Sequence, residues 1–146
     1  MTCPTLPPFA ANGIETRVFA AYLCDTDVLI DYLRGNKAAV RFFEEEATGR
    51  LLISAISVAE LYAGVKDGEE KLLADFVGSF ETIEVDTELA RQGGLLRNRF
   101  GKSHGVGLAD ALIAAGCRLH NARLVTLNRK HFPMLEDVLV PYQKKQ

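Results

Sequence analysis

The sequence lacks any long apolar segment and any pair of cysteines with metal-binding or redox spacing. Its apolar runs are all shorter than the roughly 20 residues that a membrane-spanning helix needs, so no membrane segment is expected. The three cysteines, Cys3, Cys24 and Cys117, form no CxxC motif. An odd, unpaired set excludes a disulfide framework and fits buried thiols in a reducing cytoplasm. We therefore expect a cytoplasmic protein.

The sequence also lacks a histidine cluster and an excess of charge of one sign. His104, His120 and His131 do not have the spacing of zinc ligands, so a zinc site is not expected. Lys and Arg number 17 against 19 Asp and Glu, which gives a formal net charge of −2. This balance gives no support for a simple basic nucleic-acid-binding module.

The length of 146 residues, 48% of them hydrophobic, is that of one domain with an ordinary apolar core. The opening residues contain several prolines and no continuous apolar stretch, so they do not form a signal peptide. We expect a flexible N-terminal extension over residues 1–17 and a single domain over residues 18–146.

Short apolar segments alternate with segments of helical periodicity along the rest of the chain. This alternation predicts an α/β domain in which a mainly parallel central sheet is flanked by helices. In such a sheet the carboxyl ends of the strands meet at one edge, and ligands bind outside that edge. The predicted strands cover residues 18–24, 51–54, 82–85, 123–126 and 139–140, and the predicted helices 26–34, 38–46, 57–66, 69–77, 87–100 and, after a glycine-rich break at 101–107, 108–119.

Polar residues fall at this predicted edge, directly after the strands or in the first turns of the helices that follow. They are the candidates for chemistry in an otherwise apolar region. Two follow the first strand, two open the helix after the second strand, one lies in the first turn of the apolar helix after the glycine-rich break, and one follows the strand RLVT. In this order they are Asp25 and Asp27, Ser57 and Glu60, Asp110, and Asn128.

Each of these positions also has a purely structural interpretation. Asp25 is suited to cap a helix, and Ser57 with Glu60 three residues later matches a capping box. Asp110 is favoured by the dipole of its helix, and Asn128 is an ordinary turn residue. Position by position, both interpretations stay open.

Asp110 argues most strongly for chemistry, because it lies in the apolar helical segment ADALIAAG. An acid in such a place needs a partner. No His or Lys occurs nearby in a pattern that supplies one, whereas a cation would. Carboxylates about 4 Å apart repel by about 4 kcal/mol at an effective dielectric of about 20, so several converge only around positive charge. Hard oxygen ligands describe Mg²⁺ or Mn²⁺, and such a site supports metal-assisted phosphodiester hydrolysis.

Four segments together resemble the PIN-domain ribonucleases, specifically the VapC-type toxins. They are YLCDTDVLIDYLRG (22–35), LLISAISVAELYAG (51–64), GVGLADALIAAGCRLHNARLVTLN (105–128) and KHFPML (130–135), in the family's order and spacing. The resemblance implies a PIN-like three-layer domain with Mg²⁺-dependent endoribonuclease activity, Mn²⁺ being the alternative metal. It also implies an RNA substrate, a small antitoxin whose tail covers the active site, and a homodimer.

By resemblance, Asp25, Glu60 and Asp110 are the acidic metal ligands, and Ser57 is the hydroxyl residue that steadies the site. The family's fourth acidic position falls on Asn128, which keeps an oxygen acceptor but loses the charge. We therefore expect one strong metal site.

Asp27 stands where the family often has Asn. We expect it to offset the charge missing at Asn128 through a water-mediated contact to the metal.

Two groups of basic residues are candidates for contacts to RNA phosphates on either side of the acidic edge. The alternative is a solvated helix face and loop. The first group precedes the break before Asp110 and the second follows Asn128; they are Arg97, Arg99, Lys102 and His104, and Arg129 and Lys130.

Three rival functions remain at this stage. One is a haloacid-dehalogenase-like phosphotransferase, because Asp25-Thr26-Asp27 resembles its DxD motif, with Asp25 as the covalent nucleophile. Against it, Leu29 stands where that motif has Thr or Val, and the chain is short for a capped enzyme. The others are a non-catalytic PIN-fold interaction domain and a metal with a structural role alone.

Overall fold

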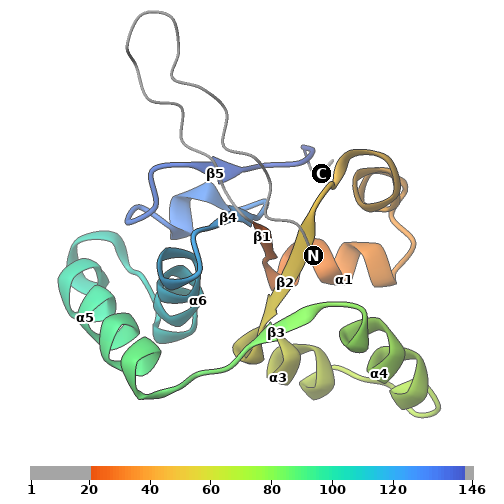
Figure 1. Cartoon of the computed structure of the whole chain (residues 1–146), viewed down its shortest axis with the longest axis horizontal. Coiled ribbons are helices and arrows are strands. Elements are labelled where there is room, and N and C mark those ends of the chain that lie inside the picture. The colour runs from red at the N-terminus through yellow and green to blue at the C-terminus, as the bar shows by residue number, and fades with distance from the viewer. Residues whose placement is uncertain (1–20, 144–146) are drawn as a thin grey trace, which may run out of the picture.

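The computed structural model describes residues 21–143 (Figure 1). The predicted flexible extension over residues 1–17, Cys3 and the first residues of the predicted strand 18–24 lie outside this range. Within residues 21–143, no helix combines the length and apolar character needed to cross a membrane.

Within the described residues, five strands form one sheet in the order β3-β2-β1-β4-β5, and every neighbouring pair is parallel. The predicted parallel α/β architecture is confirmed. The first strand of the chain lies at the centre, with later strands added on both sides, as Figure 1 shows. The strands are β1 (Ala21–Cys24), β2 (Arg50–Ser54), β3 (Glu81–Ile83), β4 (Ala122–Val125) and β5 (Val138–Leu139).

Helices cover both faces of this sheet. Helices α5 and α6 lie on one face, and α1 to α4 on the other (Figure 1). Each face has its own cluster of buried side chains: Leu96 and Ile113 belong to the first, and Leu29 and Leu61 to the second. The helices are α1 (Thr26–Leu33), α2 (Lys37–Arg41), η1 (Phe42–Glu46), α3 (Ala55–Ala63), α4 (Glu70–Gly78), α5 (Thr87–His104), α6 (Leu108–Leu119) and η2 (Arg129–His131).

The direction in which successive strands are added to the sheet reverses between β1 and β4. These two strands are neighbours, and Cys24 pairs there with Val125. The chain runs from β1 through β2 to β3 on one side and then returns to build β4 and β5 on the other. In open parallel sheets, such a reversal of strand order leaves a crevice at the carboxyl ends, where ligands bind. The residues that follow β1 and β4 therefore occupy the position expected of a functional site.

The predicted glycine-rich break is wrong in its first part. Helix α5 continues through Gly101 to His104, and the chain turns only at Gly105, whose φ is +66°. Gly101 stays helical with the Arg97 side chain lying against its Cα. A glycine inside a helix lowers its stability without ending it, whereas a positive φ needs a residue such as Gly105.

Two predicted helices also differ. The predicted helix 38–46 is an α-helix, α2, that continues as the π-helix η1 from Phe42. Helix α3 begins at Ala55, two residues before its predicted start, and its cap is Ser54, whose Oγ accepts a hydrogen bond from Ile56 N at 3.1 Å. Ser57 is therefore not a cap, and the capping-box interpretation of Ser57 and Glu60 is wrong.

Candidate active site

Asp25 lies at the junction of β1 and α1, at the carboxyl edge of the sheet. It is the N-cap of α1, with Oδ1 accepting a hydrogen bond from Thr26 N at 2.8 Å. Its Oδ2 accepts a second hydrogen bond from Thr126 Oγ1 at 2.7 Å, and both residues are buried. Asp25 therefore has the capping role that a structural interpretation gives it and also belongs to a contact between β1 and β4.

Asp27 faces the segment that follows β4. Its Oδ2 accepts hydrogen bonds from Leu127 N at 3.0 Å and from Asn128 Nδ2 at 2.8 Å. Its Oδ1 accepts one from Val28 N at 2.7 Å. The structure thus brings Asp27 and Asn128 into direct contact, although 101 positions separate them in the sequence.

Thr26 connects α1 to α3. Its Oγ1 lies 2.8 Å from Ser57 Oγ and donates to Glu60 Oε1 at 2.7 Å. Ser57 is fully buried, whereas Glu60 is exposed. The two predicted site residues of α3 are thus joined to the segment that carries Asp25 and Asp27. Thr26 was not among the predicted site residues. Its position between Asp25 and Asp27 in the sequence is the signal that could have indicated a place in the site.

Asp110 is the third residue of α6 and is partly exposed. His131 Nδ1 lies 3.6 Å from its Oδ2. The expectation that no histidine supplies a partner for Asp110 is therefore wrong. His131 belongs to η2 and follows Asp110 by 21 positions in the sequence. The helical spacing around Asp110 therefore did not reveal this contact.

Burial, with help from neighbouring charges at Asp25 and Asp110, raises the pKa of three of these acidic side chains. Burial, followed by the charge of Asp27 and with a smaller contribution from Asp110, raises the pKa of Asp25 from 3.8 to about 7. Burial also raises the pKa of Asp27, against the hydrogen bonds that it accepts. For Asp110, burial and the charges of Glu60 and Asp27 raise the pKa despite the opposing effect of His131.

Among the described residues, these carboxylates have no Lys or Arg beside them, and His131 lies near Asp110. Within residues 21–143, no Lys or Arg forms an ion pair with Asp25, Asp27, Glu60 or Asp110. A group of carboxylates with raised pKa values and no Lys or Arg partner is favourable to a divalent cation, and oxygen donors are those that Mg²⁺ and Mn²⁺ prefer. The donor set therefore fits such an ion.

The grouping is looser than one shared coordination sphere. Among the residues that the structure describes, no three Asp, Glu, His or Cys side chains are close enough to hold an ion together directly. Contact of Asp25, Glu60 and Asp110 with one ion, in part through water, stays a prediction.

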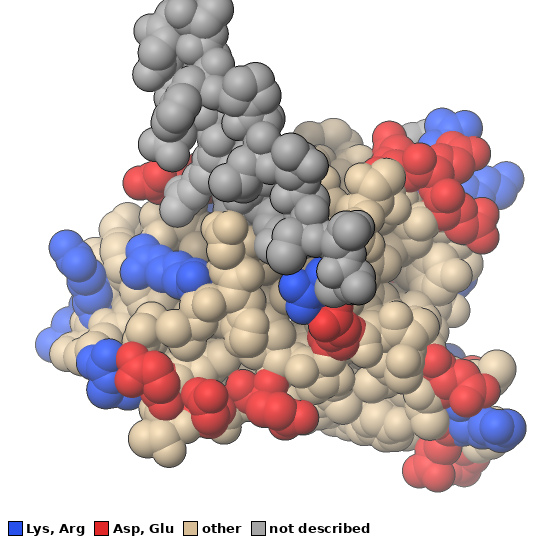
Figure 2. All heavy atoms as spheres, in the orientation of Figure 1, with Lys and Arg blue, Asp and Glu red and all other residues tan. Residues whose placement is uncertain are grey.

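The basic residues around the site are mixed with acidic ones. Figure 2 shows acidic side chains along the connection from β3 to α5, beside basic side chains over α5. Arg91 Nη2 there lies 2.6 Å from Glu88 Oε1. Of the predicted RNA-contacting residues, Arg129 donates from Nη2 to Val138 O at 3.0 Å and so contacts the first residue of β5. RNA contact by either basic group stays a prediction.

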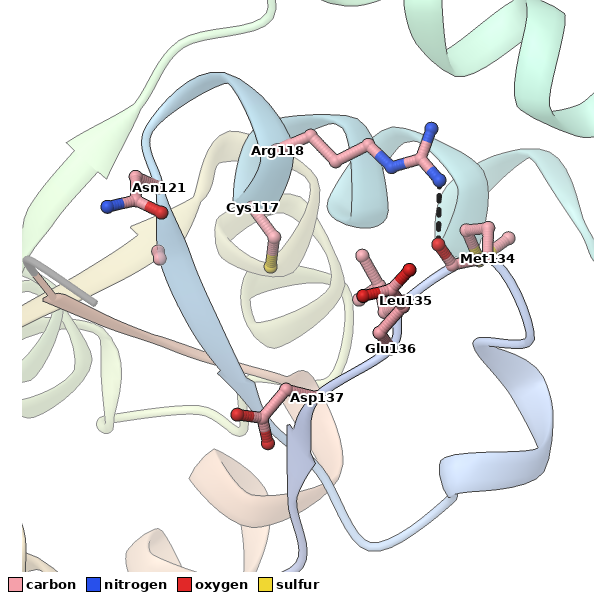
Figure 3. A pocket seen from close by; sticks show the side chains of 8 residues that line it. Cys117, Arg118, Asn121, Met134, Leu135, Glu136 and Asp137 are labelled. Carbon is pink, nitrogen blue, oxygen red and sulfur yellow. Dashed lines mark hydrogen bonds between the residues drawn. The ribbon is translucent and has the colours of Figure 1, made fainter. Parts of the chain in front are cut away.

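A separate pocket of about 390 Å³ lies at the amino end of β4, away from this edge (Figure 3). Cys117, Ala122 and Glu136 contribute to its lining. Arg118 donates a hydrogen bond to Met134 O at 2.7 Å beside it, as the dashed line in Figure 3 shows. None of the predicted site residues lines this pocket.

Comparison with known proteins defines the class to which this fold and site belong. The PIN domain model matches residues 22–135, so the chain belongs to the PIN-domain family. This membership excludes the phosphotransferase suggested by Asp25-Thr26-Asp27.

Within that family the chain groups with the VapC ribonucleases. It is 38% identical over 122 residues to Ribonuclease VapC10 of Mycobacterium tuberculosis, covering 82% of this chain and 92% of the relative. It is 37% identical to Ribonuclease VapC19 of the same organism, covering 82% of this chain and 98% of the relative. A toxin–antitoxin complex from Klebsiella pneumoniae contains a chain with the same fold, with a TM-score of 0.74, 29% identity, and coverage of 84% of this chain and 99% of that one.

Proposed function

We propose that this protein is a metal-dependent endoribonuclease that serves as the toxin of a toxin–antitoxin pair. The observation that supports this most directly is the convergence of Asp25, Asp27, Glu60 and Asp110 at the carboxyl edge of the sheet without Lys or Arg partners. Two relatives, at 38% and 37% identity, are named ribonucleases, and this supports the proposed reaction class.

In this proposal Asp25, Glu60 and Asp110 hold Mg²⁺, with Mn²⁺ as the alternative, and Asp25 is oriented by Thr126. When bound, the ion supplies positive charge for the scissile phosphate and lowers the pKa of a water molecule. Thr26 orients Glu60 through its hydroxyl, and Ser57 supports Thr26 from the buried side. Asn128 acts through Asp27, to which its amide donates.

We also propose an antitoxin partner, since solved neighbours of this fold include toxin–antitoxin complexes. A groove of about 430 Å³ between α1, α3 and α4 is lined by apolar residues such as Leu33 and Leu72 together with charged ones such as Lys66, and it reaches Glu60. Leu72 is 71% exposed. An apolar antitoxin segment in this groove would end beside the acidic site. We also propose that the protein forms a homodimer, as its resemblance to the VapC-type toxins implies.

A non-catalytic PIN domain is the competing function, and two observations favour it. The family's fourth acidic position is occupied by Asn128, and no three ligands are grouped closely enough to hold an ion directly in the described part of the chain.

Cleavage of total cellular RNA by the purified protein separates these functions. The protein is incubated with Mg²⁺, Mn²⁺ or EDTA beside Asp110→Asn and the control Asp75→Asn, which makes the same chemical change on an exposed position of α4. We expect discrete bands that require metal, a loss of at least about a hundredfold in Asp110→Asn, and full activity in the control.

Bands that persist in EDTA and in Asp110→Asn would contradict the proposed mechanism. No cleavage by a folded wild-type protein under any metal condition would favour the non-catalytic function.

A further inference from the structure

The Asp27 carboxylate is held by donors that come mostly from the segment after β4. Leu127 N and Asn128 Nδ2 both donate to Oδ2, at 3.0 and 2.8 Å. Thr126 Oγ1 lies 3.3 Å from the same oxygen. A carboxylate oxygen has two lone pairs in its plane, so two N–H donors at these distances occupy Oδ2. Asp27 therefore has only Oδ1, which already accepts from Val28 N at 2.7 Å, to offer to an ion.

The segment that Asp27 holds is the one that orients Asp25. Thr126 Oγ1 donates to Asp25 Oδ2 at 2.7 Å and accepts from Asn128 N at 3.1 Å. A hydroxyl has one proton, and the shorter contact with Asp25 receives it. A continuous path of hydrogen bonds thus runs from Asp27 through residues 127–128 and Thr126 to Asp25, between the start of α1 and the end of β4.

The pair formed by Asp27 and Asn128 carries one negative charge and one hydrogen bond. The carboxylate is on α1 and the amide on the segment after β4, with 2.8 Å between Asn128 Nδ2 and Asp27 Oδ2. An exchange of the two side chains preserves both the charge and an amide-to-carboxylate hydrogen bond. Two carboxylates at these positions would repel each other at hydrogen-bond distance. Two amides would keep a hydrogen bond but would remove the negative charge of the pair.

We propose that Asp27 and Asn128 are a positioning pair, in which Asp27 fixes the segment that orients Asp25 and supplies from α1 the single negative charge of the pair. The inference rests on the proposed function, because Asp25 is the residue being positioned. It replaces the expected water-mediated metal contact of Asp27 with a direct hydrogen bond to Asn128. Its distinguishing consequence is that the effect of a carboxylate at residue 128 depends on which side chain occupies residue 27.

Four proteins test this dependence: wild type, Asp27→Asn, Asn128→Asp and the double exchange Asp27→Asn with Asn128→Asp. We expect Asn128→Asp to lower the RNA cleavage rate about tenfold in the Asp27 background and to raise it about tenfold in the Asp27→Asn background. In EDTA, Asn128→Asp should lower the urea midpoint of unfolding in the Asp27 background. In the Asp27→Asn background, the same substitution should lower the midpoint by less than half as much. Asp75→Asn, the same change on exposed α4, should move neither measurement.

An equal effect of Asn128→Asp in both backgrounds, in the unfolding midpoint, would overturn the pair. The unfolding measurement does not depend on activity. If the wild type cleaves no RNA but the midpoints depend on the background, the proposed function fails and the pair stands. If cleavage requires metal but the midpoints are additive, the pair fails and the proposed function stands.

Discussion

At the scale of single residues, the environment of Asp25 decides how the metal-free site responds to pH. Asp25 is 8% exposed and close to Asp27 and Asp110, which places its pKa at about 7. Ionisation therefore costs the folded protein more than the unfolded chain, where the pKa is 3.8. A bound cation would remove this cost, so Asp25, the proposed metal ligand, is also a residue that destabilises the metal-free site.

The metal-free protein should accordingly lose stability as the pH rises. A pKa raised on folding gives a contribution that is complete below pH 3.8 and is lost as the pH rises through about 7. Asp25→Asn keeps a good capping side chain but removes the charge. We expect it to raise the free energy of unfolding at pH 8 relative to wild type by up to about 4 kcal/mol, and by much less at pH 5. Urea unfolding in EDTA at both pH values measures this.

Asp75→Asn, on exposed α4, is the matched control and should show no such difference between the two pH values. A stabilisation by Asp25→Asn of the same size at pH 5 and pH 8 would show that ionisation of Asp25 is not its cause.

The positions of the acidic residues and of Ser57 at the carboxyl edge could be predicted from the sequence, but the contacts of Thr26 and Thr126 with the acidic residues could not. Asp25 and Asp110 follow directly from their places after a strand and in an apolar helix. The contact of Thr26 with Glu60 spans 34 positions, and that of Thr126 with Asp25 spans 101. No local pattern encodes such contacts, because they depend on which strands become neighbours in the sheet.

At the scale of elements, the packing of α5 against α6 depends on Gly93. A Cβ built there would lie 2.5 Å from Leu112 Cδ2 and 3.1 Å from Leu112 Cα. The second atom belongs to the backbone of α6, so rotation of a side chain cannot relieve the contact. The absence of a side chain at Gly93 therefore sets how closely the two helices approach.

Gly93→Ala should lower the free energy of unfolding by about 1–3 kcal/mol, because α5 must move away from α6. Gly94→Ala is the matched control, since nothing lies within 4 Å of its built Cβ. In a helix interior that change should raise stability by about 0.5–1 kcal/mol. Thermal unfolding of both variants measures the difference, and equal shifts of the same sign would contradict the close approach at Gly93.

The elements were predictable where periodicity and end signals agree. Both ends of α6 match the prediction, and α5 begins at the predicted residue 87, after the cap Asp86, which accepts from Leu89 N at 2.9 Å. Errors arose where residues of similar propensity compete. Ser54 and Ser57 are both acceptable caps, and the burial of Ser57 against Thr26 decides between them. Gly101 carries no local sign that α5 continues past it.

At the scale of the whole molecule, the described C-terminal segment returns to the first helix. Tyr142 Oη donates to Asp31 Oδ2 at 2.8 Å, and Asp31 is 3% exposed. Burial and the charge of Asp31 raise the pKa of Tyr142, which keeps the phenol protonated as a donor. This contact joins α1, which carries Asp27, to the segment after β5.

Tyr142→Phe should lower the free energy of unfolding by about 1–3 kcal/mol, because a buried carboxylate loses a hydrogen-bond donor. Urea unfolding measures it, with Tyr62→Phe on the exposed side of α3 as the control. No change in Tyr142→Phe would mean that Asp31 is satisfied by its remaining contacts alone.

The central place of β1 has a consequence for how this protein comes into being on a ribosome. Thr126 and Asn128 emerge 101 residues later than Asp25 and Asp27, which they contact, and β4 must then insert beside β1. Because the helices α1 to α4 are already available for packing, a nascent chain can form one layer of the domain without the oriented acidic cluster. If the protein is a toxin, its activity begins only after β4 has been made and has joined the sheet, which gives an antitoxin made at the same time an opportunity to bind first.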